Sequence, residues 1–471
     1  GSIAFNYAVS QVILSTSHRP RLQLAVTTFG VAADIALLIH YKYFVTLMNF
    51  AHDWGFGSGR LDDIILPLGI SFFTFTQIGF LLDCRAGIVK ERSLLSYVLF
   101  VTFFPHLIAG PILHHKEMMP QFAKRETYRF NFENLSVGGM LFVIGLAKKV
   151  LLADPIAPFA DAGFAQPGEL QFWTAWGTGL AYALQLYFDF SGYSDMALGL
   201  AKMFGIRFPL NFNSPYKASS IIEFWARWHM TLTRYLTAYL YYPVAMAVSN
   251  YRTRHNMPVG TKGVSTIGGF AATIILPTAF TMGLAGIWHG AGLQFFIFGL
   301  LHAGYLSINH AWRIFVVGRT PAAARKDNWL KEAGYVLLTF AVVIIAQAFF
   351  RAADTSDAVR LVEGMLGLRG FDSLPNVVYP AGIALGDAWR MFMGRHLEIF
   401  HILALLAVVW FLPNSHQIMG NWSPSLAKPQ PTGPAFLRWA PNVKWLVILA
   451  LLLFLCLMNL HKEARFLYFQ F

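Results

Sequence analysis

The sequence predicts an all-α integral membrane protein that crosses the bilayer many times. Of its 471 residues, 56% are hydrophobic and only 13% are charged, whereas soluble domains are about 25% charged. So few charges cannot cover the surface of a soluble protein of this length, and a disordered chain or a nucleic-acid-binding domain is excluded as well. The apolar runs are rich in Leu, Ala, Phe and Met without strand-like alternation, so they predict helices rather than barrel strands.

The number of apolar runs sets the expected number of spans. A helix that crosses the hydrocarbon core needs about 20 mostly apolar residues, and on this measure we expect about 10–12 transmembrane helices plus re-entrant or interfacial ones. They form a single membrane domain over 1–471. Because the chain begins at Gly1-Ser2 without an initiator Met, we expect that it starts inside a longer protein or carries the remnant of a tag. The expected spans lie near 22–47, 64–82, 93–113, 135–157, 172–201, 264–286, 292–311, 333–350, 396–413 and 444–460.

The distribution of charge predicts an orientation. The net charge of +12 comes from Lys and Arg in the loops, which is typical of cytoplasmic loops and requires no nucleic-acid partner. The basic segments 251–263 and 313–331 are placed inside, and the acidic segment 159–171 is placed outside. Residues 264–312 therefore leave from the inside and return to it, so they predict a helical hairpin with His289 at its Gly-rich turn.

A second unusual segment, 205–250, predicts a re-entrant or amphipathic element. Its first part contains two prolines and several polar side chains that are suited to turns. The pattern Ser220-Ile-Ile-Glu223 is a capping box, which marks the start of a helix. We expect this helix to be amphipathic, to lie in the interface or to dip into the membrane, and to carry His229.

Ionisable groups inside apolar segments are expensive, so each is a functional candidate. For any single one, a paired or snorkelling structural group is the commoner explanation. A neutral imidazole can take a proton from a hydroxyl near pH 7, but a core histidine that donates to a carbonyl fits His229 and His289 equally well from spacing alone. The candidates are His40, His106, Lys148, Lys149, Asp189, Asp195, Glu223, His229, His289 and His302.

Other kinds of site receive less support from the sequence. Neither of the two histidines has a local His-x-x-x-His or Cys-x-x-Cys partner, so no metal site is expected. No nucleotide-binding or serine-hydrolase motif is present. The polar segment 185–195 contains Asp189, Ser191 and Tyr193, which would line an aqueous path or form a structural network between helices.

Together these motifs carry a resemblance to a known family. The chain resembles the membrane-bound O-acyltransferases, in the bacterial branch that includes alginate O-acetyltransferases and teichoic-acid D-alanyl transferases. Because the family usually has further N-terminal helices, the resemblance implies that such helices are missing here. The motifs follow the family order from about residue 64 to the end of the chain. They are Leu66-Pro-Leu-Gly-Ile-Ser-Phe-Phe-Thr-Phe75, Phe103-Phe-Pro-His-Leu-Ile-Ala-Gly-Pro111, Gly145-Leu-Ala-Lys-Lys-Val-Leu-Leu-Ala-Asp154, Leu186-Tyr-Phe-Asp-Phe-Ser-Gly-Tyr-Ser-Asp195, Asn211-Phe-Asn-Ser-Pro-Tyr216, Glu223-Phe-Trp-Ala-Arg-Trp-His-Met-Thr-Leu232, Trp288-His-Gly-Ala-Gly292, Phe411-Leu-Pro-Asn414 and Tyr468-Phe-Gln-Phe471.

The resemblance implies a fold, an activity and residue roles. It implies helices around a central tunnel, in which His289 is the catalytic histidine and His229 the second active-site histidine. His289 would act as general base on an acceptor hydroxyl, while His229, Asn211 or Asn213 would position the donor or stabilise the oxyanion. The further candidates for the tunnel lining are Trp288, Trp225, Asp189, Ser191 and Tyr193.

The resemblance also implies substrates and a location. The expected acyl donor is a cytoplasmic thioester, acetyl-CoA or an acyl carrier protein, and no tightly bound cofactor is expected. The expected acceptor is a hydroxyl of an extracytoplasmic polysaccharide or of a periplasmic partner protein, and the protein is placed among the lipids of the bacterial inner membrane. Alginate-type members read Arg-Asp-Tyr-Leu-Tyr-Ile-Pro-Leu-Gly-Gly where this chain has Thr237-Ala-Tyr-Leu-Tyr-Tyr-Pro-Val-Ala-Met246. The lost acid and glycines argue against alginate as the final acceptor.

Two other classes of function remain open on the sequence. A transporter or flippase of an acyl or lipid-linked group would also use polar intramembrane groups and broken helices, although no corresponding broken segments recur in two halves of the chain. A structural scaffold for polysaccharide secretion would depend on none of the histidines.

Overall fold

The computed structural model describes most of the chain as helices. It describes residues 1–56, 59–62, 64, 67, 69–107, 110–317, 328–372, 385–427, 434–460 and 467, with the backbone alone over 385–396. These residues form helices, turns and loops without a strand, which confirms the all-α fold class. The C-terminal motif 468–471, the basic positions within 318–327 and part of the expected span 64–82 lie outside the described residues.

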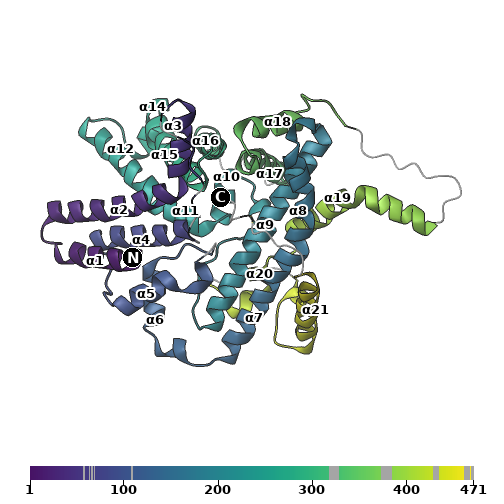
Figure 1. Cartoon of the computed structure of the whole chain (residues 1–471), viewed down its shortest axis with the longest axis horizontal. Coiled ribbons are helices and arrows are strands. Elements are labelled where there is room, and N and C mark those ends of the chain that lie inside the picture. Colours follow the sequence, from purple (N-terminus) through teal and green to yellow (C-terminus); the bar gives the residue numbers. More distant parts are fainter. Residues whose placement is uncertain are drawn as a thin grey trace. The chain divides into compact units, whose positions relative to one another are not determined.

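One compact unit comprises residues 1–144, 193–211 and 419–431. Within it, α1, α2 and α4 lie side by side (Figure 1). Its core is apolar and includes the fully buried side chains of Tyr97, Phe100 and Met118. Its helices are α1 (Ser2–Ser15), α2 (Pro20–Lys42), α3 (Phe44–Asp53), α4 (Ile70–Arg85), α5 (Leu94–Thr102), α6 (His115–Phe122) and most of α7 (Phe132–Ala147).

The second compact unit comprises residues 145–192, 212–418 and 432–471 and contains the site described below. Its core gathers around α9 and α17, where Tyr182, Leu184 and Ile344 are buried. The helices α7 and α9 each contribute residues to both units. The helices are α8 (Asp154–Ala165), α9 (Phe172–Met203), α10 (Ile221–Arg227), α11 (Met230–Leu236), α12 (Tyr242–Arg254), α13 (Gly260–Val264), α14 (Ile267–Phe270), α15 (Leu276–His289), α16 (Leu293–Ala311), α17 (Trp329–Arg351), α18 (Thr355–Met365), α19 (Leu385–Phe411), α20 (Ser415–Ile418) and α21 (Val443–Asn459).

Several helices have the length and composition of membrane spans. Among the described residues, four helical stretches qualify: Pro20–Lys42, Phe132–Ala165, Ile267–His289 and Trp329–Arg351. The second and third are continuous because π-helical turns join α7 to α8 and α14 to α15. Shorter apolar helices accompany them, so the polytopic class is confirmed, while the expected 10–12 spans and the central tunnel stay predictions.

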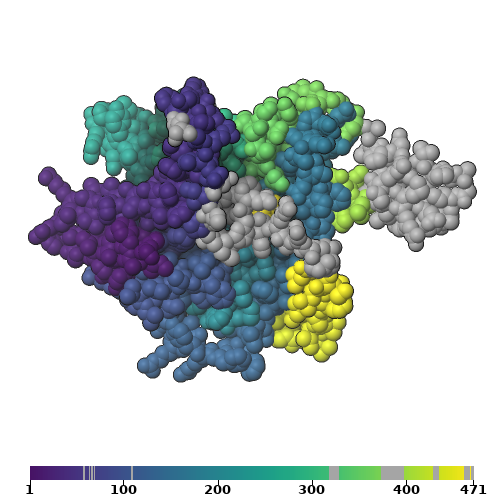
Figure 2. All heavy atoms as spheres, in the orientation of Figure 1, coloured from purple at the N-terminus to yellow at the C-terminus, as the bar shows by residue number. Residues whose placement is uncertain are grey.

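The apolar surface of α21 fits a lipid environment. This helix lies at the surface, in yellow in Figure 2. Its side chains Val443, Leu446, Leu451, Phe454 and Leu457 are each more than half exposed. Soluble proteins rarely expose so much contiguous apolar surface, so this face is suited to contact with lipid tails.

Two of the expected helices differ from the structure. The helix expected over 93–113 is shorter: α5 ends at Thr102, and only a 3₁₀ turn over Phe104–His106 follows. Pro105, within that turn, lacks the amide hydrogen that a continuing helix would need. The expectation that the helix begun at Ser220 carries His229 is also wrong, because α10 ends at Arg227.

Candidate active site

The hairpin of α15 and α16 positions His289. His289 is the last residue of α15, and α16 begins at Leu293 after a short Gly-rich turn. The two helices approach closely because both carry glycine where they meet. A Cβ on Gly286 would lie 2.3 Å from the carbonyl oxygen of Phe295, and a Cβ on Gly299 would lie 2.2 Å from that of Met282. No other residue fits at either position without moving a helix.

The break between α10 and α11 positions His229. Ser220 begins α10 by accepting a hydrogen bond from the backbone N–H of Glu223, 3.2 Å away, which confirms the predicted cap. The helix then stops, and His229 adopts a left-handed backbone conformation with φ of +41° before α11 begins. A non-glycine residue in this region is uncommon and costs energy. The chain therefore turns sharply at His229, which directs its ring into the interior.

His229 and His289 line the same cavity. Its volume is about 30 Å³, which is enough for one or two water molecules. Both side chains are buried, with exposed fractions of 2% and 8%. The wall is completed mainly by aromatic and aliphatic side chains. The lining residues are Leu186, Phe190, Phe224, Trp225, Trp228, His229, Leu232, His289, Phe298, His302, Val343, Gln347 and Phe350.

Aromatic rings fix both imidazoles. The His229 ring meets Phe190 edge to face, with centroids 4.8 Å apart, and stacks on Phe212 at 6.3 Å. The His289 ring meets Phe350 edge to face at 4.8 Å and lies 4.6 Å from the ring of its neighbour Trp288. These contacts restrict the rotation of each imidazole ring, so Nδ1 and Nε2 of each histidine point in defined directions. Trp288 thus contacts His289, but it is not part of the cavity wall.

A third histidine, His302, one of the ionisable candidates of the sequence, also belongs to the cavity wall. It lies on α16, and its Nδ1 accepts a hydrogen bond from Nε1 of Trp225 at 3.2 Å. Its ring also stacks on Phe224 and meets Phe298 edge to face. The predicted Trp225 therefore lines the cavity and is held by a histidine. The available signal was a histidine within an apolar run, four residues after Phe298 on the same helix face.

A fourth polar group of the wall, Gln347, was not among the candidates from the sequence. It is an amide within the long apolar run of α17, and its Nε2 donates to the hydroxyl of Tyr216 at 3.3 Å. That hydroxyl in turn donates to the carbonyl of Ala183 at 2.8 Å. A polar amide in an apolar span was the available signal.

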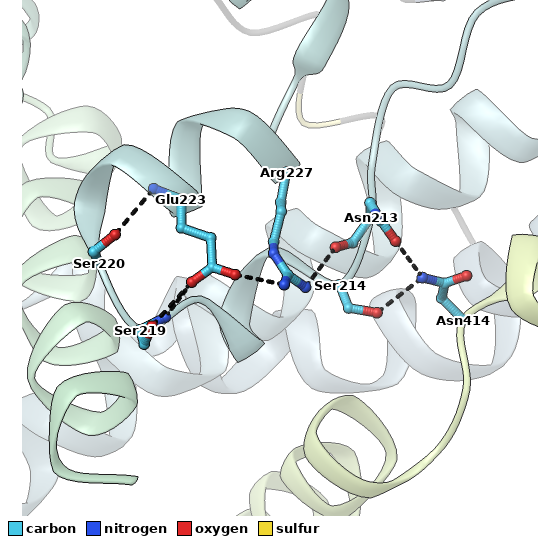
Figure 3. A network of polar contacts seen from close by, with 7 residues as sticks. All are labelled: Asn213, Ser214, Ser219, Ser220, Glu223, Arg227 and Asn414. Atoms are coloured by element: carbon cyan, nitrogen blue, oxygen red, sulfur yellow. Dashed lines mark hydrogen bonds and ion pairs between the residues drawn. The ribbon is translucent and has the colours of Figure 1, made fainter. Parts of the chain in front are cut away.

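Asn213 forms part of a structural network instead of the cavity wall (Figure 3). Its backbone N–H donates to the carbonyl of Arg227 at 2.9 Å, and its side-chain oxygen accepts from Asn414 at 3.0 Å. Asn414 also donates to Ser214 at 2.9 Å, and Glu223 pairs with Arg227. The network joins the motif that contains Asn213 to the motif that ends at Asn414, so Asn213 holds two loops together.

The remaining predicted residues lie elsewhere. Asp189 forms an ion pair with Lys149 at 2.7 Å, and Lys149 also pairs with the partly exposed Asp154 at 2.6 Å, so these groups form a charge cluster. Ser191 is buried on the same helix α9 and is not part of the cavity wall. Asn211 and Tyr193 belong to the other compact unit, where Asn211 donates to Ser194 at 3.2 Å. The structure does not place these two against the cavity.

The cavity can support proton transfer between polar groups in an apolar surrounding. Imidazole has an ordinary pKa of about 6.5, so a neutral ring can accept a proton from a hydroxyl and later return it. The apolar wall strengthens electrostatic interactions within the cavity because it excludes water. Two buried histidines at one cavity therefore provide the parts of a general acid–base site.

Comparison with known proteins agrees with this chemistry. Residues 81–254 match the family described as MBOAT, membrane-bound O-acyltransferase family. The peptidoglycan O-acetyltransferase of Helicobacter pylori is 40% identical over 397 residues, which cover 79% of this chain and 70% of that protein.

More distant relatives belong to the same family. The "Probable alginate O-acetylase AlgI" of Pseudomonas aeruginosa is 36% identical over 374 residues, 78% of this chain and 65% of the relative. The teichoic acid D-alanyltransferase of Streptococcus thermophilus is 26% identical over 295 residues, 60% of this chain and 68% of that protein. The chain thus spans between 65% and 70% of these proteins. It belongs to the membrane-bound O-acyltransferase family and is an enzyme of the O-acyltransferase class.

Proposed function

We propose that this protein transfers an acetyl group from a cytoplasmic thioester to a hydroxyl of an extracytoplasmic polysaccharide or of a partner protein. The observation that carries the proposal is the shared cavity of His229 and His289. The peptidoglycan and alginate O-acetylases among the relatives support acetyl as the group. The bacterial inner membrane is the location that suits a cytoplasmic donor and an extracytoplasmic acceptor.

The proposed reaction needs a base and a proton donor in turn. His289 accepts the proton of the acceptor hydroxyl as its oxygen attacks the thioester carbonyl, and a C–O bond forms. When the tetrahedral intermediate collapses, the C–S bond breaks and the imidazolium returns the proton to the thiolate. A base of this kind contributes about 10²–10⁴-fold to the rate.

His229 completes the proposed site because it lines the same cavity as His289. Because the sharp turn at φ of +41° fixes its ring, it can donate a hydrogen bond to the carbonyl oxygen as negative charge develops. A preorganised donor of this type contributes about 10²–10³-fold. Asn213 is engaged with Asn414, so the proposal assigns this role to His229.

The test is acetyl release from radiolabelled acetyl-CoA by the purified protein in lipid nanodiscs. The variants are His289→Ala and His229→Ala, and the matched control is His255→Ala, an exposed histidine at the end of α12. We expect both cavity variants to lose at least 100-fold in turnover and the control to keep it. Full turnover by His289→Ala would overturn the proposal, and movement of substrate without bond cleavage would favour a transporter.

A further inference from the structure

Gln347 is the one amide side chain of the described cavity wall, and the proposed reaction gives it no role. It lies on α17 between Ala346 and Ala348 and is 4% exposed. A leucine or methionine would fill the same place in an apolar helix without burying polar atoms. The amide therefore requires a physical explanation.

A chain of hydrogen bonds sets the direction of this amide. Tyr216 has a single hydroxyl proton, and it donates that proton to the carbonyl of Ala183 at 2.8 Å. The hydroxyl oxygen can then only accept from Gln347, so the group 3.3 Å away must be the NH₂ end of the amide. The reverse orientation would bring two acceptors together. Oε1 is consequently held at the other end.

Oε1 of Gln347 accepts no hydrogen bond from any residue that the structure describes. Buried polar atoms are almost always paired, and an exception at a cavity points to a ligand group that pairs with it. Because Oε1 is a pure acceptor, the matching ligand group must be an N–H or O–H donor.

The chemistry of the two substrates distinguishes the possible donors. The acceptor hydroxyl has one proton, and the proposed base takes it, so a second acceptor would compete with the base. The thioester brings a different donor. Both CoA and acyl carrier proteins present the acyl group on a pantetheine arm, whose amide N–H is separated from the sulfur by an ethylene group. That N–H takes no part in bond making or breaking, so a hydrogen bond to it does not compete with the proposed base.

We propose that Oε1 of Gln347 accepts a hydrogen bond from the amide N–H of the pantetheine arm next to the thioester. The inference rests on the proposed function and adds the group that recognises its donor. Since Tyr216 and Ala183 fix the amide, the bond sets how far the arm enters the cavity. It thereby directs the thioester carbonyl toward His229 and His289, in a cavity that must widen from about 30 Å³ to admit it. The same bond serves CoA and carrier-protein donors alike.

Two small thioesters test this bond. S-acetyl-N-acetylcysteamine contains the amide N–H, and S-acetyl-2-mercaptoethyl acetate replaces it by an ester oxygen with nearly the same shape. The readout is the ratio of their kcat/KM values for thiol release in lipid nanodiscs. One neutral hydrogen bond predicts a preference of about 3–10-fold for the amide in the wild type. Gln347→Leu should bring the ratio to about 1 by the same argument.

A second buried glutamine provides the matched control. Gln185 lies on α9 in the same unit, is 5% exposed, has an Oε1 without a partner among the described residues and is not part of the cavity wall. Gln185→Leu should therefore keep the wild-type ratio. Tyr216→Phe keeps Gln347 but frees the amide to rotate, so the ratio should fall part of the way.

The outcomes separate this inference from the proposed function. Equal turnover of the two thioesters by the wild type would overturn the inference, and Oε1 would then pair with water. An unchanged preference in Gln347→Leu would also overturn it. If Gln347→Leu does not fold, Tyr216→Phe decides: a reduced preference supports the bond and an unchanged one contradicts it. Absence of any thioester turnover by the wild type would instead overturn the proposed function, and this inference with it.

Discussion

The indole N–H of Trp225 donates to Nδ1 of His302 across 3.2 Å. Because an indole nitrogen only donates, Nδ1 of His302 must be unprotonated, and a neutral His302 carries its proton on Nε2. The bond connects α10 to α16, so it joins the segment that ends at His229 to the hairpin that carries His289. This bond therefore gives His302 a role in positioning Trp225 in the wall of the cavity that the two histidines share.

His302→Ala should reduce kcat without preventing folding. Loss of the bond frees the Trp225 ring, and one neutral hydrogen bond of this kind is worth about 0.5–1.5 kcal/mol. The measurement is a double-mutant cycle of His302→Ala and Trp225→Phe, read both as kcat and as the free energy of unfolding. We expect the two changes to be less than additive. Full additivity would show that the bond has no role in either property.

His229→Asn and His229→Val should separate folding from catalysis. Asn tolerates the left-handed conformation, whereas a β-branched residue at φ of +41° adds strain of about 1–2 kcal/mol. We therefore expect both variants to be inactive and only the Val variant to unfold at a clearly lower temperature. Thermal unfolding in nanodiscs measures this, and equal stability of the two would contradict the left-handed turn.

Gly286→Ala should separate α15 from α16. The added Cβ would lie 2.3 Å from the Phe295 carbonyl oxygen, and overpacking of this kind costs about 1–3 kcal/mol. Because His289 is the last residue of α15, acetyl transfer should fall as well. Gly304→Ala on α16 is the control, since its Cβ would meet nothing within 4 Å. Similar losses in both variants would show that helix propensity or expression, and not the contact, is responsible.

Asp372 should make stability depend on pH. Its carboxylate accepts from the backbone N–H groups of Trp173 at 2.8 Å and Thr174 at 3.1 Å, at the start of α9. Burial acts to raise the pKa of Asp372, but the hydrogen bonds with Thr174 and Trp173 together outweigh it, so the pKa is lower than usual. The stabilisation is complete above the ordinary carboxylate pKa, near 3.9, and is lost as pH falls through the lowered value.

Asp372→Asn isolates this contribution. At pH 7 we expect it to lower the free energy of unfolding by about 0.5–2 kcal/mol, as for the loss of a charged helix cap. The difference from wild type should shrink as the pH falls below the pKa of the carboxylate. Unfolding midpoints measured from pH 7 to pH 3 check this, and a difference that is constant with pH would contradict the assignment.

Local signals predicted a large part of the fold and of the site. Length and hydropathy predicted the all-α class, the cap at Ser220 was read from four residues, and the glycines around His289 indicated a turn. These features depend on residues close together in the sequence, so a local sequence pattern can predict them. The sequence did not predict the break after Arg227, because helix propensity continues through Trp228. The tertiary packing of His229 overrides that propensity.

Long-range pairings could not be predicted in this way. Gln347 meets Tyr216 across 131 residues of sequence, and Asn414 meets Asn213 across 201. A histidine or an amide in an apolar run signals a polar role, but its partner depends on how distant helices pack. The sequence therefore predicted a site role for Asn213 but could not predict its hydrogen bond with Asn414.

The central claim is that His229 and His289 act on one thioester as a unit. The most direct measurement is the turnover of acetyl-CoA by His229→Ala, His289→Ala and the double variant in nanodiscs, with bound acetyl-CoA measured separately. Residues that act as a unit are strongly non-additive, so we predict that the double variant is about as slow as the slower single variant. Losses that multiply in the double variant, or wild-type turnover in either single variant, would contradict the account.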